Sequence, residues 1–179
     1  MKKIVFLLAI LVGSLAFFAC GGGTDDTIMK QSDEMYATAE QRVQEIEDID
    51  EFFIFLDDFA AQKEDFIHEV VVPAYYVDDS TVNVPNKVHD HIYNRATDYN
   101  KVEAVQYAKL IEPYLSRLEK ATNDLYNADA KTDKKQLEAY RTEMEESYEA
   151  ILPYAFYDNV LPELQERFED VVKKMDSME

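Results

Sequence analysis

The sequence predicts an all-α protein, an antiparallel bundle of four to five helices with an irregular crossover near residues 73–97. Two observations indicate this class. Only four glycines occur in 179 residues, and none follows Gly23. Hairpins and bulges in β-sheets depend on glycine for positive φ, so the rest of the chain is poorly suited to a β-rich fold. Apolar residues also recur every three or four positions along most of that stretch, which is the period of an amphipathic helix.

A first helix is predicted before residue 48 and a second after it. The segment Asp48-Ile49-Asp50-Glu51 has the Asp-x-x-Glu form of a capping box, so it predicts the N-terminus of the second helix. Pro73 should end the second helix, because proline lacks a main-chain N–H and clashes with the preceding turn. The second helix has a wide apolar face, which predicts a central place in the core. The apolar positions are Met35, Ala39, Val43 and Ile46 in the first helix, and Phe52, Phe55, Leu56, Phe59, Phe66, Ile67 and Val70 in the second.

The crossover at residues 73–97 interrupts this rhythm. Turn-forming residues such as Pro85, Asn86 and Asn94 are spread among tyrosines and valines there. A short helical piece after Pro85 is the only regular element expected within the crossover.

Three helical segments follow the crossover. Pro113 should kink the first of them, since it removes one main-chain hydrogen bond. The polar residues 127–132 connect it to the second, and Thr132 or Asp133 can cap that second segment. The apolar positions of the first two segments are Ala104, Ala108, Ile111, Leu115, Leu118 and Leu125, then Leu137, Tyr140, Met144, Tyr148, Ile151 and Ala155.

Two prolines delimit the last helix. Pro153 should bend or end the preceding segment, and Pro162 is acceptable in the first turn of the last one, where its missing N–H has no helical partner. The apolar positions of this helix are Leu161, Leu164, Phe168, Val171 and Met175.

The chain is strongly acidic, with 37 acidic and 18 basic residues and a formal charge of −19. Such a surface repels phosphate backbones, so nucleic acid is excluded as an expected partner. It also disfavours polybasic docking on anionic lipid.

The N-terminal segment predicts export. Lys2 and Lys3 are followed by an uncharged apolar run, Ile4 to Ala19, which is shorter than the roughly 20 residues of a membrane-spanning helix. Positive charge, a short apolar run and a small residue at its end are typical of a secretory signal peptide. We therefore expect residues 1–19 to be cleaved.

The end of this segment, Ala19-Cys20, resembles the lipobox of bacterial lipoproteins, although Phe17 and Phe18 differ from its usual leucine and small residue. The resemblance implies that Cys20, the only cysteine of the chain, becomes an acylated N-terminus. It then carries a thioether-linked diacylglyceride and an amide-linked acyl chain. Residues 20–26 would form the lipidated cysteine and a flexible tether, and residues 27–179 a single helical domain.

The resemblance also implies a location. The protein is expected to be lipid-anchored and extracytoplasmic in a bacterial cell envelope, with the membrane as a partner. Gly21 is not the aspartate that retains lipoproteins at the inner membrane in some bacteria. The outer membrane is therefore favoured in a Gram-negative host.

Candidate ligand residues lie in the crossover. Tyrosine combines an apolar ring with a polar tip, which suits a binding surface. The speculative ligand surface comprises Tyr75, Tyr76, His89, His91 and Tyr93. A metal site formed by the two histidines with His68 or Glu69 is an alternative, because imidazole and carboxylate suit zinc or iron. Solvent-facing histidines in a polar crossover are the preferred explanation of the pattern, so no metal or cofactor is assigned.

No catalytic motif is present. The chain has no Gly-x-Ser-x-Gly sequence and no glycine-rich phosphate loop. The prediction is therefore a non-catalytic binding or scaffolding module with a protein or small-molecule partner. The alternatives are a small-ligand or metal-binding lipoprotein that uses residues 73–99, and an enzyme whose site has no recognisable motif.

Overall fold

The computed structural model describes residues 24–78, 81–129 and 131–178, and these are mostly helical, which confirms the all-α class. The long helices of this part of the chain are α1 (Thr24–Glu45), α2 (Ile49–Asp65), α4 (Asn86–Tyr126), α5 (Lys134–Ile151) and α6 (Pro162–Asp176). Its short elements are a π-helix (Phe66–Val71), α3 (Val72–Tyr75), an antiparallel pair β1 (Tyr76–Asp78) and β2 (Thr81–Val82), and a 3₁₀ helix (Leu152–Tyr154).

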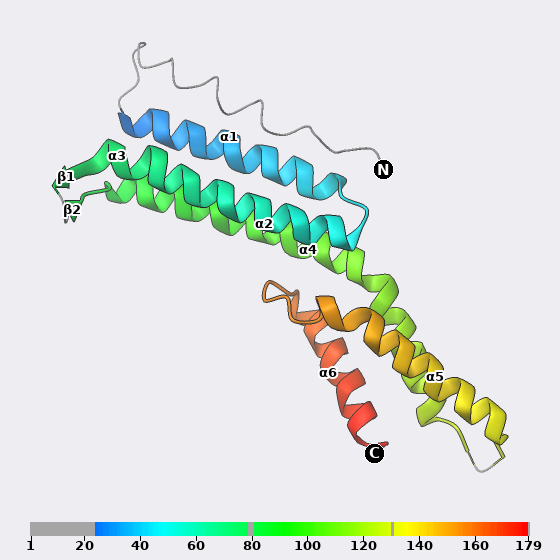
Figure 1. The fold of residues 1–179 in the computed structure, drawn as a ribbon. Helices are drawn as coiled ribbons and strands as arrows, with labels where there is room; N and C mark the ends of the chain where they lie inside the picture. The colour runs from blue at the N-terminus through cyan, green and yellow to red at the C-terminus, as the bar shows by residue number, and fades with distance from the viewer. Residues whose placement is uncertain (1–23, 79–80, 130, 179) are drawn as a thin grey trace.

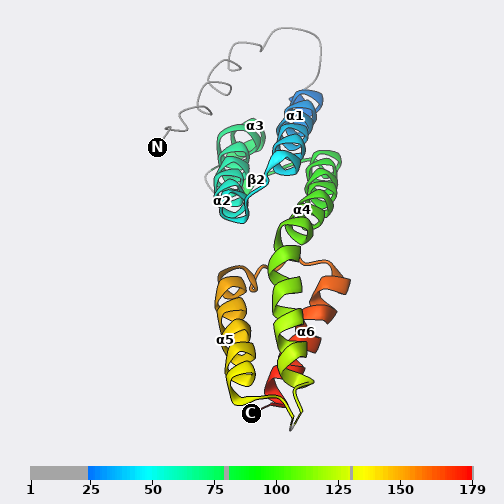
Figure 2. The ribbon, with the colours of Figure 1, turned by 90° about the vertical axis from the view of Figure 1, so that its right-hand side faces the viewer.

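The central helix is α4, and the prediction that the second helix is central was wrong. α4 has 41 residues and is about 60 Å long at the usual rise per residue. Its first half lies beside α1 and α2, and its second half lies beside α5 and α6 (Figures 1 and 2). The bundle therefore consists of two three-helix halves that share α4. Helix α4 continues through Pro113 and changes direction between the halves.

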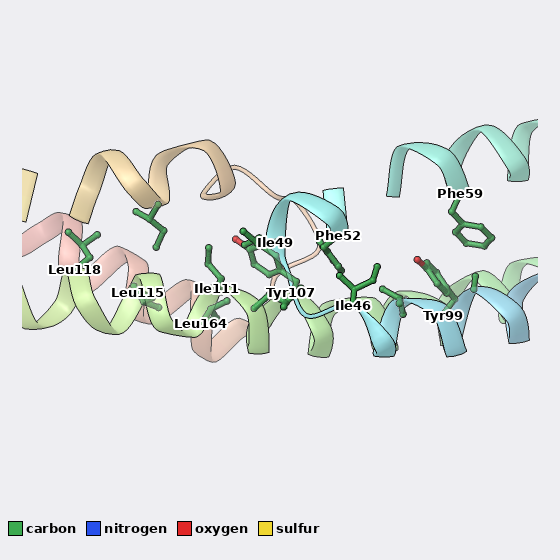
Figure 3. Close-up of a cluster of buried hydrophobic side chains, with 14 of the residues drawn as sticks. Ile46, Ile49, Phe52, Phe59, Tyr99, Tyr107, Ile111, Leu115, Leu118 and Leu164 are labelled. Atoms are coloured by element: carbon green, nitrogen blue, oxygen red, sulfur yellow. The ribbon is translucent and has the colours of Figure 1, made fainter. Parts of the chain in front are cut away.

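One connected cluster of buried side chains runs through both halves. Phe59 and Tyr99 are in contact in the first half, with their ring centroids 4.7 Å apart. Phe52 and Tyr107 lie in the middle of the cluster, and Leu115, Leu118 and Leu164 continue it in the second half (Figure 3). The two halves thus share this core, and a smaller, separate cluster in the first half comprises Ile28, Val71 and Val88.

The predicted helix ends at the polar connections are confirmed. Asp48 accepts a hydrogen bond from the main-chain N–H of Glu51, and Asp133 accepts one from Gln136, so both act as N-caps. Helix α6 begins at Pro162. Helix α5 ends two residues before Pro153, which lies in the 3₁₀ helix.

Pro73 does not end the second helix, contrary to the prediction. The chain passes from α2 into the π-helix and then into α3, and it remains helical to Tyr75. The main-chain N–H of Val72 donates to the carbonyl of Ile67, five residues back. This wider turn accommodates a proline that would clash with a carbonyl of a regular α-helix.

The irregular crossover is shorter than the predicted 73–97. It is confined to the two-stranded hairpin and the residues up to Pro85, because α4 begins at Asn86. Pro85 has an extended conformation, and its carbonyl accepts hydrogen bonds from the N–H groups of Val88 and His89. This arrangement starts the first turn of α4 without a side-chain cap.

The N-terminal predictions lie partly outside the described residues. Helix α1 already includes residues 24–26, which were assigned to the flexible tether. The predicted signal peptide, Cys20 and the three glycines after it fall within residues 1–23, which the structure does not describe. None of the described helices is both long enough and apolar enough to cross a bilayer.

Candidate functional site

Tyr75 has a structural role in the first half of the bundle. Its hydroxyl donates to Asp25 Oδ1 at 2.6 Å, and Lys87 Nζ lies 2.9 Å from Asp25 Oδ2. Burial, together with the neighbouring Asp25 carboxylate, raises the pKa of Tyr75 to about 12. Hydrogen bonds from Lys87 and Tyr75 lower the pKa of Asp25. These three side chains join α1, α3 and the start of α4.

The candidate histidines contact different carboxylates. His91 Nε2 lies 2.9 Å from Asp33 Oδ1, His89 Nδ1 lies 3.3 Å from Asp90, and His68 Nε2 lies 3.9 Å from Glu64. Among the described residues, no group of three or more metal-ligating side chains could hold an ion. The metal-binding alternative gains no support from this part of the chain.

Tyr76 and Tyr93 are exposed, by 53% and 64% of their surface, on β1 and α4 respectively. Neither of them lines the pocket at Glu103, which is described next. Tyr75, His89 and His91 thus contact three different carboxylates, and Tyr76 and Tyr93 lie on different elements.

A pocket of about 430 Å³ lies where the two halves of the bundle meet. It is open to solvent, and three parts of the chain contribute to it. Its walls include Phe53 from α2, Asn100 and Glu103 from α4, and Phe156, Tyr157 and Asn159 from the loop before α6. We call this feature the Glu103 pocket.

Glu103 is a buried carboxylate, with only 8% of its surface exposed. The hydroxyl of Tyr157 donates to its Oε1. The side-chain amide of Asn159 donates to the same oxygen at 3.2 Å and to the main-chain carbonyl of Asn100 at 2.7 Å. The loop before α6 is thereby fastened to α4 through the carboxylate.

Aromatic rings hold Tyr157 in this position. Its ring centroid lies 4.5 Å from that of Tyr107, 5.7 Å from that of Phe53 and 5.9 Å from that of Phe52. Burial raises the pKa of Tyr157, and its hydrogen bond to Glu103 adds to this effect. Tyr157 therefore remains a neutral donor across the physiological pH range.

Tyr99 lies on the interior side of Glu103. Its side chain is fully buried, and its hydroxyl has no partner of normal hydrogen-bond geometry among the described residues. Burial raises the pKa of Tyr99, and the nearby Glu103 carboxylate raises it further. The Glu103 carboxylate thus lies between two tyrosines, Tyr99 on the core side and Tyr157 on the pocket side.

A second pocket, of about 290 Å³, lies between α4 and α6. Arg167 occupies its wall and contacts Glu119 at 2.8 Å and Glu112 at 2.6 Å. Lys174 donates to Asn123 at 2.9 Å. The charge of Arg167 is therefore already matched within the protein.

Glu103 was not predicted from the sequence as a site residue. The available signal was a charged residue on the buried face of a helix, because Tyr99, Glu103 and Tyr107 are spaced by four residues. Charged residues are almost never fully buried unless they are paired. No local pattern predicts that Tyr157 and Asn159 contact Glu103, because both lie more than fifty residues further along the chain.

Comparison with known proteins gives no assignment. No protein family matches the chain, and neither curated proteins nor solved structures include a match.

Proposed function

We propose that this chain is a lipid-anchored protein of a bacterial cell envelope and acts there as a non-catalytic binding module. The observation that carries the proposal is the order of features at the N-terminus. A short apolar run ends at the only cysteine, and a folded helix begins at Thr24.

The anchor would be held close to the bundle. At most about 3.5 Å of chain per residue separates Cys20 from Thr24, so the acyl chains would start within roughly 15 Å of the first turn of α1. That end of the bundle also carries α3 and the β1–β2 hairpin (Figure 1). Several acyl chains hold a protein stably on a bilayer, whereas a single chain holds it only marginally.

A binding role is supported by the Glu103 pocket, which offers a buried carboxylate and aromatic walls in a volume typical of small-ligand sites. The small-ligand alternative predicted from the sequence uses residues 73–99, and the Glu103 pocket is a second place at which such a ligand could bind. The sequence contains no motif that supports catalysis.

Metabolic labelling with palmitate tests the anchor. The full chain should incorporate label and remain in the membrane fraction, and Cys20→Ala should lose both properties. Gly23→Ala is a matched control, because it changes the same segment and keeps the thiol. Equal label in Cys20→Ala and the unaltered chain, or unchanged membrane retention, contradicts the proposal.

A further inference from the structure

We infer that the Glu103 pocket binds a small organic molecule that carries an ammonium group on an apolar body. The inference rests on the binding part of the proposed function and names its ligand class. Three properties of the pocket support it: a buried carboxylate without a cationic partner among the described residues, two neutral donors that orient this carboxylate, and aromatic walls.

The negative charge of Glu103 has no cationic partner among the described residues, where both of its hydrogen bonds come from neutral groups. Other carboxylates between the helices are matched by arginine. Arg167 contacts Glu112 and Glu119, and Arg95 contacts Glu40. A buried carboxylate is costly unless it is paired, so a cation that enters the pocket would gain an unusually strong interaction.

Two neutral donors orient the carboxylate. Tyr157 and Asn159 both donate to Oε1 of Glu103. The two donors orient the carboxylate before a ligand arrives, which reduces the cost of binding. An ammonium group can donate to the Glu103 carboxylate in a charge-assisted hydrogen bond, whereas a neutral ligand cannot match the charge.

The walls suit the rest of such a ligand. Phe53 and Tyr157 present aromatic rings, which attract cations and bury apolar groups. Phe156 also lines the pocket, although 82% of its surface is exposed, so a large apolar ring is left in solvent at the entrance. Asp158 adds a second acidic group to the lining. Anionic ligands are disfavoured by these charges.

Isothermal titration calorimetry of the full-length chain in detergent at neutral pH tests the inference. The probes are 2-phenylethylamine and its neutral analogue 2-phenylethanol. We expect saturable binding of the amine and binding of the alcohol that is about tenfold weaker or undetectable. Because acylation does not affect this titration, its outcome is independent of the palmitate experiment.

The variant Glu103→Gln keeps a similar shape and removes the charge, so it should weaken amine binding about tenfold or more. Glu145→Gln, on the exposed surface of α5, changes the net charge equally and should bind as the unaltered chain does. Equal affinity for amine and alcohol, or equal affinity of the unaltered chain and Glu103→Gln, overturns the inference.

A second variant tests the inference if Glu103→Gln does not fold. If Glu103→Gln lacks the helical circular dichroism of the unaltered chain, Phe156→Ala decides the question, because its exposed ring is not needed for the core. Weaker amine binding by Phe156→Ala supports the pocket as the site, and unchanged binding excludes it.

Discussion

Gln106 donates a hydrogen bond from its side-chain amide to the main-chain carbonyl of Ile46. Both residues are buried, with 5% and 1% of their surface exposed. The bond therefore joins the middle of α4 to the turn between α1 and α2, where a main-chain carbonyl would otherwise be buried without a partner. It is one of the polar contacts that determine how the first half of the bundle is placed on α4.

Substitution of Gln106 by leucine should destabilise the fold. The carbonyl of Ile46 would lose its partner, and an unsatisfied buried acceptor costs about 1–3 kcal/mol. Urea denaturation followed by circular dichroism measures the change in the free energy of unfolding. Gln41→Ala is the matched control, because Gln41 is exposed on α1 and its side-chain amide donates to the exposed Glu45. Its effect should stay within about 0.5 kcal/mol. Equal effects of the two substitutions would show that the Gln106 bond is not needed.

Tyr157→Phe tests the hydrogen bond to Glu103. The ring and its aromatic contacts are kept, and the donor to a buried carboxylate is lost. A hydrogen bond to a charged group contributes about 1.5–3 kcal/mol, so the free energy of unfolding should fall by that order. Tyr93→Phe is the control, since 64% of Tyr93 is exposed. Denaturant melts of both variants give the comparison, and an unchanged midpoint for Tyr157→Phe contradicts the assigned role.

The helix boundaries show which parts of the fold are encoded locally. Asp48 and Asp133 were predictable as caps because each accepts from an N–H only three residues ahead. A short helical piece after Pro85 was predicted too, and α4 begins there at Asn86. Its unbroken continuation into the next helical segment was not predicted, because turn-forming residues such as Asn94 stand between the apolar positions. Those positions, Val88, Ile92, Ala96 and Tyr99, follow the helical period and face the interior. Packing of this stripe outweighs the turn preference of the exposed residues between its positions.

The Glu103 pocket shows what the sequence could not reveal. Glu103 stands on a stripe of aromatic residues and could have been noticed there. Its partners Tyr157 and Asn159 belong to a loop whose position is set by the packing of Tyr107 and Phe53. A contact of this kind depends on tertiary structure, and no period or motif in the sequence expresses it.

The ion pairs of Arg167 with Glu112 and Glu119 predict that the stability of the protein decreases at acidic pH. Hydrogen bonds from Arg167, and then from Ser116, lower the pKa of Glu112 below its ordinary value of 4.5. Because the pKa of Glu112 is lowered on folding, its ion pair with Arg167 contributes fully to stability at a pH above the pKa of Glu112 in the unfolded chain. This contribution is lost as the pH falls through the lower pKa that Glu112 has in the folded chain.

Arg167→Gln should therefore be less stable than the unaltered chain at neutral pH, and the difference should disappear in acid. Arg167 and Glu112 are 36% and 48% exposed, so screening limits the difference to about 1 kcal/mol. Denaturant melts between neutral pH and a pH well below 4.5 measure it. Arg141→Gln, on the exposed surface of α5, serves as the control for net charge. A difference that persists at the lowest pH would mean that Arg167 acts through packing and not through its ion pairs.

Thr122→Val should stabilise the protein, in contrast to the other substitutions. Thr122 is fully buried in α4, and its hydroxyl has no hydrogen-bond partner among the described residues. Valine has nearly the same shape and helix propensity, so the exchange removes the unsatisfied hydroxyl at little other cost. The expected gain is about 1 kcal/mol, which corresponds to a rise in Tm of about 2–4 °C for a chain of this size. Thr97→Val is the control, because its exposed hydroxyl donates to the carbonyl of Tyr93 at 2.9 Å, and this change should leave Tm the same or slightly lower. A lower Tm for Thr122→Val would show instead that the hydroxyl is satisfied in solution, for example by a buried water molecule between α4 and α6.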